Sequence, residues 1–380
     1  MLDLARRTFY SDDHHLFRDQ VRKFFERELV PHLERWEVQG EIDRDFWCKA
    51  GEAGLLCATV PEAYGGLGLD FGYNAVIDEE LGYAGSSAGI GLHSDIVAPY
   101  IVVYGSEELK GRWLPRMISG ETPTAIAMTE PGAGSDLQGI KTTAVKDGTD
   151  YVINGSKTYI TNGQHAELII VVAKTDPAEG ARGTSLILVE ADRPGFARGR
   201  NLDKIGLHGQ DTSELFFQDV RVPQANLLGA EGMGFAYLMN QLPQERLGIA
   251  VGAQASAQRA FDEAVKFTKE RKAFGRTVFE FQNTRFTLAD LAAKLQVGWA
   301  HLDWALARHM AGALTAAEAS AAKLWHTELQ WALCDASLQL HGGAGYMNEY
   351  LIARLWRDAR VTRIFGGTNE IMKEVISRSI

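Results

Sequence analysis

The spacing of apolar residues predicts helices along roughly the first hundred residues. After Ser11, which suits the N-cap position, apolar side chains recur at the helical period until Pro31. A glycine-rich stretch follows at 64–68, and because no strand precedes it, we interpret it as a loop rather than a phosphate-binding loop. The same helical period predicts further helices over 43–53, 73–83 and 90–104.

Between about residues 122 and 232 the pattern changes to short β-rich runs. Three of these runs are bounded by turn residues, at 168–173, 185–190 and 215–222. The dipeptide Asn154-Gly155 separates two further short runs and predicts a hairpin turn.

The helical period returns from Met233 to the end of the chain. Small apolar residues on one face of 245–270 favour close helix packing. Thr315 and Glu318 form a capping box for a helix that ends at Gly342, and Thr368 suits the N-cap of the last helix. Because helices precede and follow the strands without βαβ alternation, we predict an α+β chain rather than a Rossmann sheet. Its expected domains are 1–122, 123–232 and 233–380.

The composition limits the classes of partner. The chain has 380 residues, of which 46% are hydrophobic, and a formal charge of −10, so we expect sizeable cores but no basic surface for nucleic acid or anionic membrane. Three cysteines without CxxC spacing argue against a zinc or other metal site and against a disulfide framework, which favours a reducing, cytoplasmic setting. We expect no stable membrane insertion, because no apolar run reaches roughly 18 residues, and we see no signal-type stretch at the N-terminus.

Three segments carry candidate chemistry, although each one alone is typical of a turn or a helix cap. Residues 127–136 (AMTEPGAGSD) combine small residues with hydroxyl groups, and their backbone amides could wrap a flat polar ligand or a pyrophosphate. Residues 339–346 (QLHGGAGY) end a helix in glycines. Residues 364–371 (IFGGTNEI) form a loop followed by a capped helix.

Taken together and in this order, the three segments resemble the acyl-CoA dehydrogenase family, over essentially the whole chain. The resemblance is greatest to its long-chain branch, through 241–247 (QLPQERL) and 366–374 (GGTNEIMKE). It implies an N-terminal all-α domain, a central β-barrel-like domain and a C-terminal four-helix bundle. It also implies a homotetramer, built as a pair of dimers, with one FAD per subunit.

The resemblance further implies where FAD binds. The segment 126–135 would follow the flavin and its phosphates, with Thr129 near the N5 edge of the ring, and Tyr159 would stand where many relatives place a tryptophan that excludes water. Arg271, whose guanidinium matches a pyrophosphate in fork geometry, would hold the other end of FAD across the dimer interface. The complete expected set is Ile126, Met128, Thr129, Gly134, Ser135, Tyr159, Ile160, Thr161, Arg271, Phe274, Gln282, Gln339, Gly342, Gly343, Thr368 and Glu370.

The expected catalytic base is Glu245. Many family members carry the catalytic glutamate where this sequence has Gly366, whereas the long-chain and isovaleryl branches supply it from the position of Glu245. Because proline suits the first turn of a helix, Pro243 predicts that Glu245 lies in the N-terminal turn of its helix. The expected substrate-binding residues are Ser135, Pro243, Gln244, Arg246, Gly366 and Gly367.

The resemblance therefore implies a FAD-dependent enzyme of fatty acid β-oxidation. It would oxidise a straight or branched, medium-chain or long-chain acyl-CoA to the trans-2-enoyl-CoA, with an electron-transferring flavoprotein as electron acceptor. One alternative is an acyl-CoA oxidase, which the length of 380 residues disfavours. Another is an inactive FAD-binding scaffold, which Gly366 suggests and Glu245 disfavours.

Overall fold

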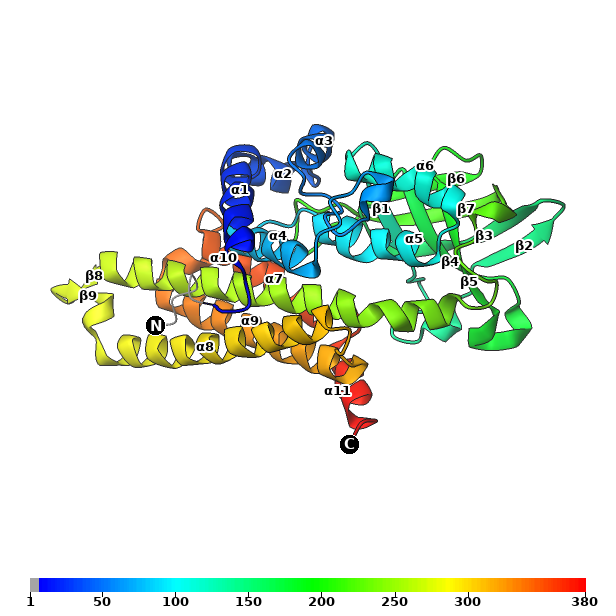
Figure 1. Cartoon of the computed structure of the whole chain (residues 1–380). Coiled ribbons are helices and arrows are strands. Elements are labelled where there is room, and N and C mark those ends of the chain that lie inside the picture. The colour runs from blue at the N-terminus through cyan, green and yellow to red at the C-terminus, as the bar shows by residue number, and fades with distance from the viewer. Residues whose placement is uncertain (1–6) are drawn as a thin grey trace.

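The computed structural model describes residues 7–380 and has three regions. Figure 1 shows the N-terminal helices lying along one side of a set of long C-terminal helices, with a curled sheet at one end of the molecule. The two helical regions and the sheet meet beside the first half of the long helix α7 (Gly234–Glu270).

The N-terminal region is helical, as the apolar spacing predicts. The Ser11 hydroxyl accepts a hydrogen bond from the backbone N–H of His14 and caps the first helix. In place of one helix over 90–104, the chain forms a π-helical segment, Leu92–Val97, directly before α5 (Ala98–Tyr104). Such π-helical turns are rare and are frequent at functional sites. The other α-helices of this region are α1 (Asp12–Glu28), α2 (Leu33–Gln39), α3 (Arg44–Glu52), α4 (Phe71–Ala84) and α6 (Glu107–Ile118).

Within residues 7–380, seven strands form the central sheet in the order β1-β4-β2-β3-β7-β6, and β5 pairs with β4. Alternate residues of β4 point to opposite faces, so Ile170 joins the core shared with the N-terminal helices while Val171 joins the core of the sheet itself. The strands are β1 (Thr124–Ala127), β2 (Thr143–Asp147), β3 (Asp150–Thr161), β4 (Leu168–Lys174), β5 (Thr184–Glu190), β6 (Phe196–Asn201) and β7 (Thr212–Pro223).

The prediction of a hairpin turn at Asn154-Gly155 is wrong. The strand β3 continues through this dipeptide, and its pairing with β7 shifts register there, which marks a β-bulge. Glycine is required because a Cβ at Gly155 would lie 2.4 Å from the Thr142 hydroxyl oxygen. The actual turn joins β2 to β3 at Gly148, whose φ is 61°.

The C-terminal region is built on three long helices, which extend from the sheet to the far end of the molecule in Figure 1. No helix of residues 7–380 combines the length and apolar character needed to cross a bilayer. These helices are α7, α8 (Gln282–Met310) and α9 (Ala316–His341), and they are completed by α10 (Leu351–Ala359) and α11 (Asn369–Ser377). A short hairpin of β8 (Lys272–Ala273) and β9 (Arg276–Thr277) follows α7.

The predicted start of α7 is also wrong. The helix begins at Gly234, so Pro243 lies inside it and Glu245 is not in its N-terminal turn. Gly234 packs directly on the sheet, because a Cβ there would lie 2.8 Å from the backbone of Ser185. This contact with the sheet favours helix formation well before the proline.

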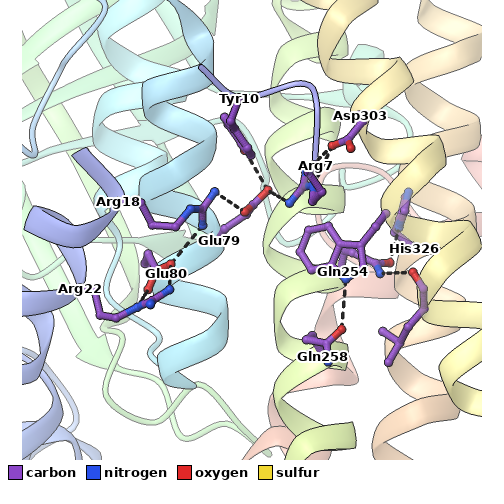
Figure 2. Close-up of polar contacts among 12 residues, drawn as sticks. Arg7, Tyr10, Arg18, Arg22, Glu79, Glu80, Gln254, Gln258, Asp303 and His326 are labelled. Atoms are coloured by element: carbon purple, nitrogen blue, oxygen red, sulfur yellow. Dashed lines mark hydrogen bonds and ion pairs between the residues drawn. The ribbon is translucent and has the colours of Figure 1, made fainter. Parts of the chain in front are cut away.

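Ion pairs of two buried glutamates on α4 fix this helix against its neighbours (Figure 2). Arg7 pairs with Glu79 of α4 and with Asp303 of α8. The neighbouring Glu80 pairs with Arg18 and Arg22 of α1. Because α4 also packs closely on α7, these pairs hold one wall of the cavity described below.

Candidate active site

A cavity of about 620 Å³ lies where the N-terminal helices, the sheet and the C-terminal helices meet. Its wall includes parts of α4, the π-helical segment, β1, β3 and α7, together with the loop before α11. Of the residues predicted for the site, it brings together Ile126, Met128, Thr129, Gly134, Ser135, Tyr159, Ile160, Thr161, Gln244, Glu245, Arg246, Gly366 and Gly367.

The loop after β1 is fixed by a buried ion pair that the sequence did not suggest. The Lys157 ammonium is fully buried and donates hydrogen bonds to the Met128 carbonyl at 3.0 Å and to Oε1 of Glu130 at 2.8 Å. Glu130 also accepts hydrogen bonds from the backbone N–H groups of Lys141 and Thr142. Burial lowers the pKa of Lys157 to about 8 although Glu130 favours its charged form. These contacts hold Thr129 against the cavity.

Tyr159 presents its ring to the same wall because of a local irregularity in β3. Its φ is 60°, and the pairing of β3 with β7 shifts register between Lys157 and Ile160. The side chain is 69% exposed within this chain. Across the wall, a Cβ at Gly134 would meet no atom within 4 Å, so backbone lies open to the cavity there. An aromatic ring and exposed backbone amides fit a flat, phosphate-bearing group such as FAD.

Glu245 lies on α7 with its carboxyl group buried at the cavity wall. Only 6% of the residue is exposed, and the Tyr100 hydroxyl donates a hydrogen bond of 2.9 Å to Oε1. Burial raises the pKa of Glu245 to about 7, while the Tyr100 hydrogen bond and the charge of Arg246 act in the opposite direction. A carboxyl group with such a pKa is suited to proton transfer near neutral pH.

Two buried cations hold the loop that contains Gly366. Arg246 donates hydrogen bonds to the Ser320 hydroxyl at 3.1 Å and to the Gly366 carbonyl at 3.4 Å. Lys323, which is fully buried, donates a hydrogen bond of 2.9 Å to the Gly367 carbonyl. The loop is therefore anchored from α7 and from α9.

Two aspartates that the sequence motifs did not indicate, Asp78 and Asp95, line the part of the cavity between α4 and the π-helical segment. A Cβ at Gly91 would lie 3.0 Å from Oδ1 of Asp78 and 3.2 Å from Oδ2 of Asp95. Asn74 donates a hydrogen bond to Asp95, and Gln244 donates one of 2.7 Å to the Asp95 carbonyl. Burial raises the pKa of both aspartates, which favours a protonated, weakly charged wall.

The remaining predicted residues lie outside the cavity wall. Pro243 lies within α7 but does not line the cavity, and Thr368 caps α11, next to Glu370. Phe274 is 95% exposed at the β8–β9 hairpin, at the end of the molecule opposite the sheet in Figure 1. The other predicted residues of the C-terminal region outside the wall are also exposed: Arg271, Gln282, Gln339, Gly342 and Gly343.

Models of protein families match nearly the whole chain. Residues 11–121 match the family model "Acyl-CoA dehydrogenase, N-terminal domain", 125–220 the middle domain and 232–380 the C-terminal domain. The chain belongs to the acyl-CoA dehydrogenase family. This confirms the family, the enzyme class and the order of helical, sheet and helical domains predicted from the motifs.

Individual relatives extend this result. The mitochondrial long-chain specific acyl-CoA dehydrogenase of Sus scrofa is 50% identical over 100% of this chain and 89% of that protein. The crystal structure of an acyl-CoA dehydrogenase from Geobacillus kaustophilus is 54% identical, with a TM-score of 0.96 over 98% of this chain and 99% of the other. An acyl-CoA dehydrogenase from Bacillus anthracis, crystallised with FAD, is 35% identical, with a TM-score of 0.92 over 97% of this chain and 68% of that one. The family's enzymes are flavoproteins that bind FAD.

Proposed function

We propose that this chain oxidises medium-chain and long-chain acyl-CoA thioesters, straight or branched, to trans-2-enoyl-CoA, with Glu245 as the base. The observation that carries the proposal is the position of Glu245. Its buried carboxyl group faces the same cavity as the wall of Thr129 and Tyr159, and Gly366 faces that cavity without a carboxylate.

In the proposed reaction, the substrate loses a proton from its α-carbon and a hydride from its β-carbon, and each has its own acceptor. Glu245 takes the proton from the α-carbon, and the electron pair of the broken C–H bond forms the new double bond as hydride leaves the β-carbon. Residues 126–135 and 159–161 would hold FAD, which would supply the hydride acceptor at N5. Because burial raises the pKa of Glu245 to about 7, its carboxylate is a stronger base than that of an exposed glutamate.

Replacement of Glu245 by glutamine tests the base. Glu245→Gln keeps the shape and the Tyr100 contact but removes the proton acceptor, so we expect FAD and acyl-CoA to bind while anaerobic flavin reduction falls by several orders of magnitude. Glu374→Gln, at another part of the cavity wall, is the matched control and should reduce flavin at nearly the normal rate. Near-normal bleaching in Glu245→Gln would show that another group is the base.

The chain-length preference is tested with a series of saturated acyl-CoA thioesters. Small and apolar side chains of α4, the π-helical segment and α7 line one part of the cavity, among them Leu81, Gly82, Leu92, Gly252 and Ala253. Because these residues leave room and present apolar surface, octanoyl-CoA and palmitoyl-CoA should reduce the flavin faster than butyryl-CoA. A strong preference for butyryl-CoA would contradict this prediction.

We also propose a homotetramer built from dimers, an electron-transferring flavoprotein as acceptor and a cytoplasmic setting. Exposed apolar side chains on α8 and α9, including Phe286, Trp304 and Trp325, support further burial in an assembly. Purified enzyme whose reduced flavin stays bleached in air but is reoxidised by such a flavoprotein would distinguish a dehydrogenase from an oxidase.

A further inference from the structure

Tyr100 reaches the candidate base from a different part of the chain. It lies on α5, it is fully buried, and its hydroxyl donates the 2.9 Å hydrogen bond to Oε1 of Glu245 on α7. Within residues 7–380, no hydrogen bond reaches the other oxygen, Oε2, and Glu245 lines the cavity. The two oxygens therefore have different surroundings, one fixed by a phenol and one without a protein donor.

The backbone around Tyr100 is held firmly. One helical turn further along α5, the ring of Tyr104 stacks on Tyr237 of α7, with ring centroids 3.9 Å apart and an angle of 21° between the planes. The Tyr104 carbonyl also accepts a hydrogen bond of 2.8 Å from the backbone N–H of Gly229. Because these contacts join α5 to the start of α7, they set the position of the Tyr100 phenol relative to Glu245.

We propose that Tyr100 is a positioning residue for the reaction: its hydroxyl fixes Oε1 so that Oε2 of Glu245 points to the substrate α-carbon, and it stabilises the charged carboxylate that must accept the proton. This inference rests on the proposed role of Glu245 as the base. A phenol suits the task because it donates one hydrogen bond and is held by packing of its ring.

The groups around Glu245 allow the effect of Tyr100 to be isolated. Burial, together with the charge of Glu245, raises the pKa of Tyr100 well above its usual value, so the phenol remains a donor at neutral and moderately alkaline pH. The charge of Arg246 acts on Glu245, but the hydrogen bonds of its guanidinium go to Ser320 and Gly366. Other titratable groups line the same cavity: Asp78 on α4, Asp95 on the π-helical segment, Asp136 in the loop after β1, Tyr159 on β3, Asp358 on α10, Glu374 on α11 and Arg378 directly after α11. Tyr104 on α5 lies beside the ring of Tyr100.

The test measures proton removal separately from flavin reduction. An acyl-CoA with a quaternary β-carbon has α-hydrogens but no β-hydride to lose, so exchange of its α-hydrogens with deuterated water reports the base alone. We would measure this exchange, and flavin reduction by octanoyl-CoA, as functions of pH in the holoenzyme. Tyr100→Phe removes only the hydroxyl. Tyr104→Phe is the matched control, because it keeps the ring that stacks on Tyr237 and removes a hydroxyl that forms no hydrogen bond with Glu245 within residues 7–380.

In Tyr100→Phe, the midpoint of both pH profiles should move to alkaline pH by about one unit, because the charged carboxylate loses a hydrogen bond. The maximal rate at high pH should also fall, by roughly tenfold, as the carboxylate loses its orientation. Tyr104→Phe should leave both profiles unchanged. Unshifted midpoints in Tyr100→Phe with normal FAD content would overturn the proposal and leave Tyr100 a purely structural residue.

A second variant separates the loss of the hydrogen bond in Tyr100→Phe from any change in packing. Difluorotyrosine at position 100 has nearly the same shape but a more acidic hydroxyl, so it should move the midpoint in the acid direction; no movement would count against the proposal. Glu245→Gln, measured in the same exchange experiment, separates the two levels of inference. If Glu245→Gln exchanges α-hydrogens at the normal rate, Glu245 is not the base. If Glu245→Gln does not exchange them, Glu245 remains the base, and unshifted midpoints in the Tyr100 variants would contradict only the role of Tyr100.

Discussion

At the scale of single residues, the proposed function depends on the position of one carboxylate. Glu245 lines the cavity, and Gly366, the other position at which we expected a base in this family, lines the same cavity. Gly366 has φ of 64°, a left-handed conformation in which a side chain costs roughly 1–2 kcal/mol. A Cβ there would also lie 2.4 Å from Cδ1 of Ile249, the flexible end of its side chain, which can move.

These facts predict the outcome of moving the base. Glu245→Gly combined with Gly366→Glu should recover part of the flavin reduction that Glu245→Gly alone loses, because both positions face the same cavity. Recovery should be incomplete, since backbone strain and the displacement of Ile249 disturb the loop. Rates of anaerobic bleaching by octanoyl-CoA measure this, and Gly366→Ala in the otherwise unchanged enzyme reports the cost of the side chain alone. A double variant as inactive as Glu245→Gly would show that the two positions do not reach the same α-proton.

Residues that act through distant partners were the hardest to predict from the sequence. Glu245 could be proposed because a motif surrounds it, whereas Tyr100 lies 145 residues away in a segment without any motif. Lys157 also lies outside the motifs, and its role depends on burial and on its contact with Glu130 in the loop after β1. Local sequence patterns do not contain this information.

At the scale of elements, hydrophobic periodicity predicted which segments are helices or strands better than where they begin and turn. The pattern after Met233 indicated a helix, but Pro243 suggested a start that packing of Gly234 on the sheet overrides. Likewise Asn154-Gly155 is typical of a tight turn, yet here the glycine serves a bulge within β3. In both cases a tertiary contact outweighed a local preference.

The buried ion pair of Lys157 and Glu130 should stabilise the loop after β1, which we expect to contact the flavin. Lys157→Met leaves the Glu130 carboxylate buried without its cation, which should cost about 3–5 kcal/mol of stability and lower the ratio of FAD to protein. Adding Glu130→Gln removes the unpaired charge and should restore much of the loss. Lys146→Met, which breaks the exposed pair with Glu231, is the control and should change the melting temperature little. Equal effects of the buried and exposed lysines would contradict this role.

At the scale of the whole molecule, most of the residues proposed for FAD form two separate groups, and only Thr368 and Glu370, at the start of α11, belong to neither. One group lines the cavity beside the sheet, and the other is exposed near the β8–β9 hairpin at the far end of the long helices (Figure 1). Arg271 follows Glu245 by 26 residues along α7, which places them roughly 39 Å apart at 1.5 Å per residue. This separation supports the proposal that each FAD is shared between two subunits.

The last prediction follows from this separation: the cofactor and the dimer should be lost together. Within the described residues Arg271 forms no ion pair, so its guanidinium is available to a pyrophosphate from a neighbouring subunit. Arg271→Ala should weaken FAD binding by about 10- to 100-fold, the effect of a charge-assisted contact of about 1.5–3 kcal/mol. Flavin absorbance and sedimentation velocity on serial dilution would show apo-protein accumulating as dimers dissociate.

Lys269→Ala is the matched control for that experiment, because it removes an exposed positive charge from the last turn of the same helix but lies outside the predicted FAD set. It should retain FAD at dilutions where Arg271→Ala has lost it. If Arg271→Ala keeps full flavin occupancy, or if the unchanged enzyme keeps FAD as a monomer, then the exposed group does not bind the cofactor of a neighbouring subunit. The cavity-lining group would then have to hold FAD within one chain, and the exposed apolar surface of Phe274 would need another partner.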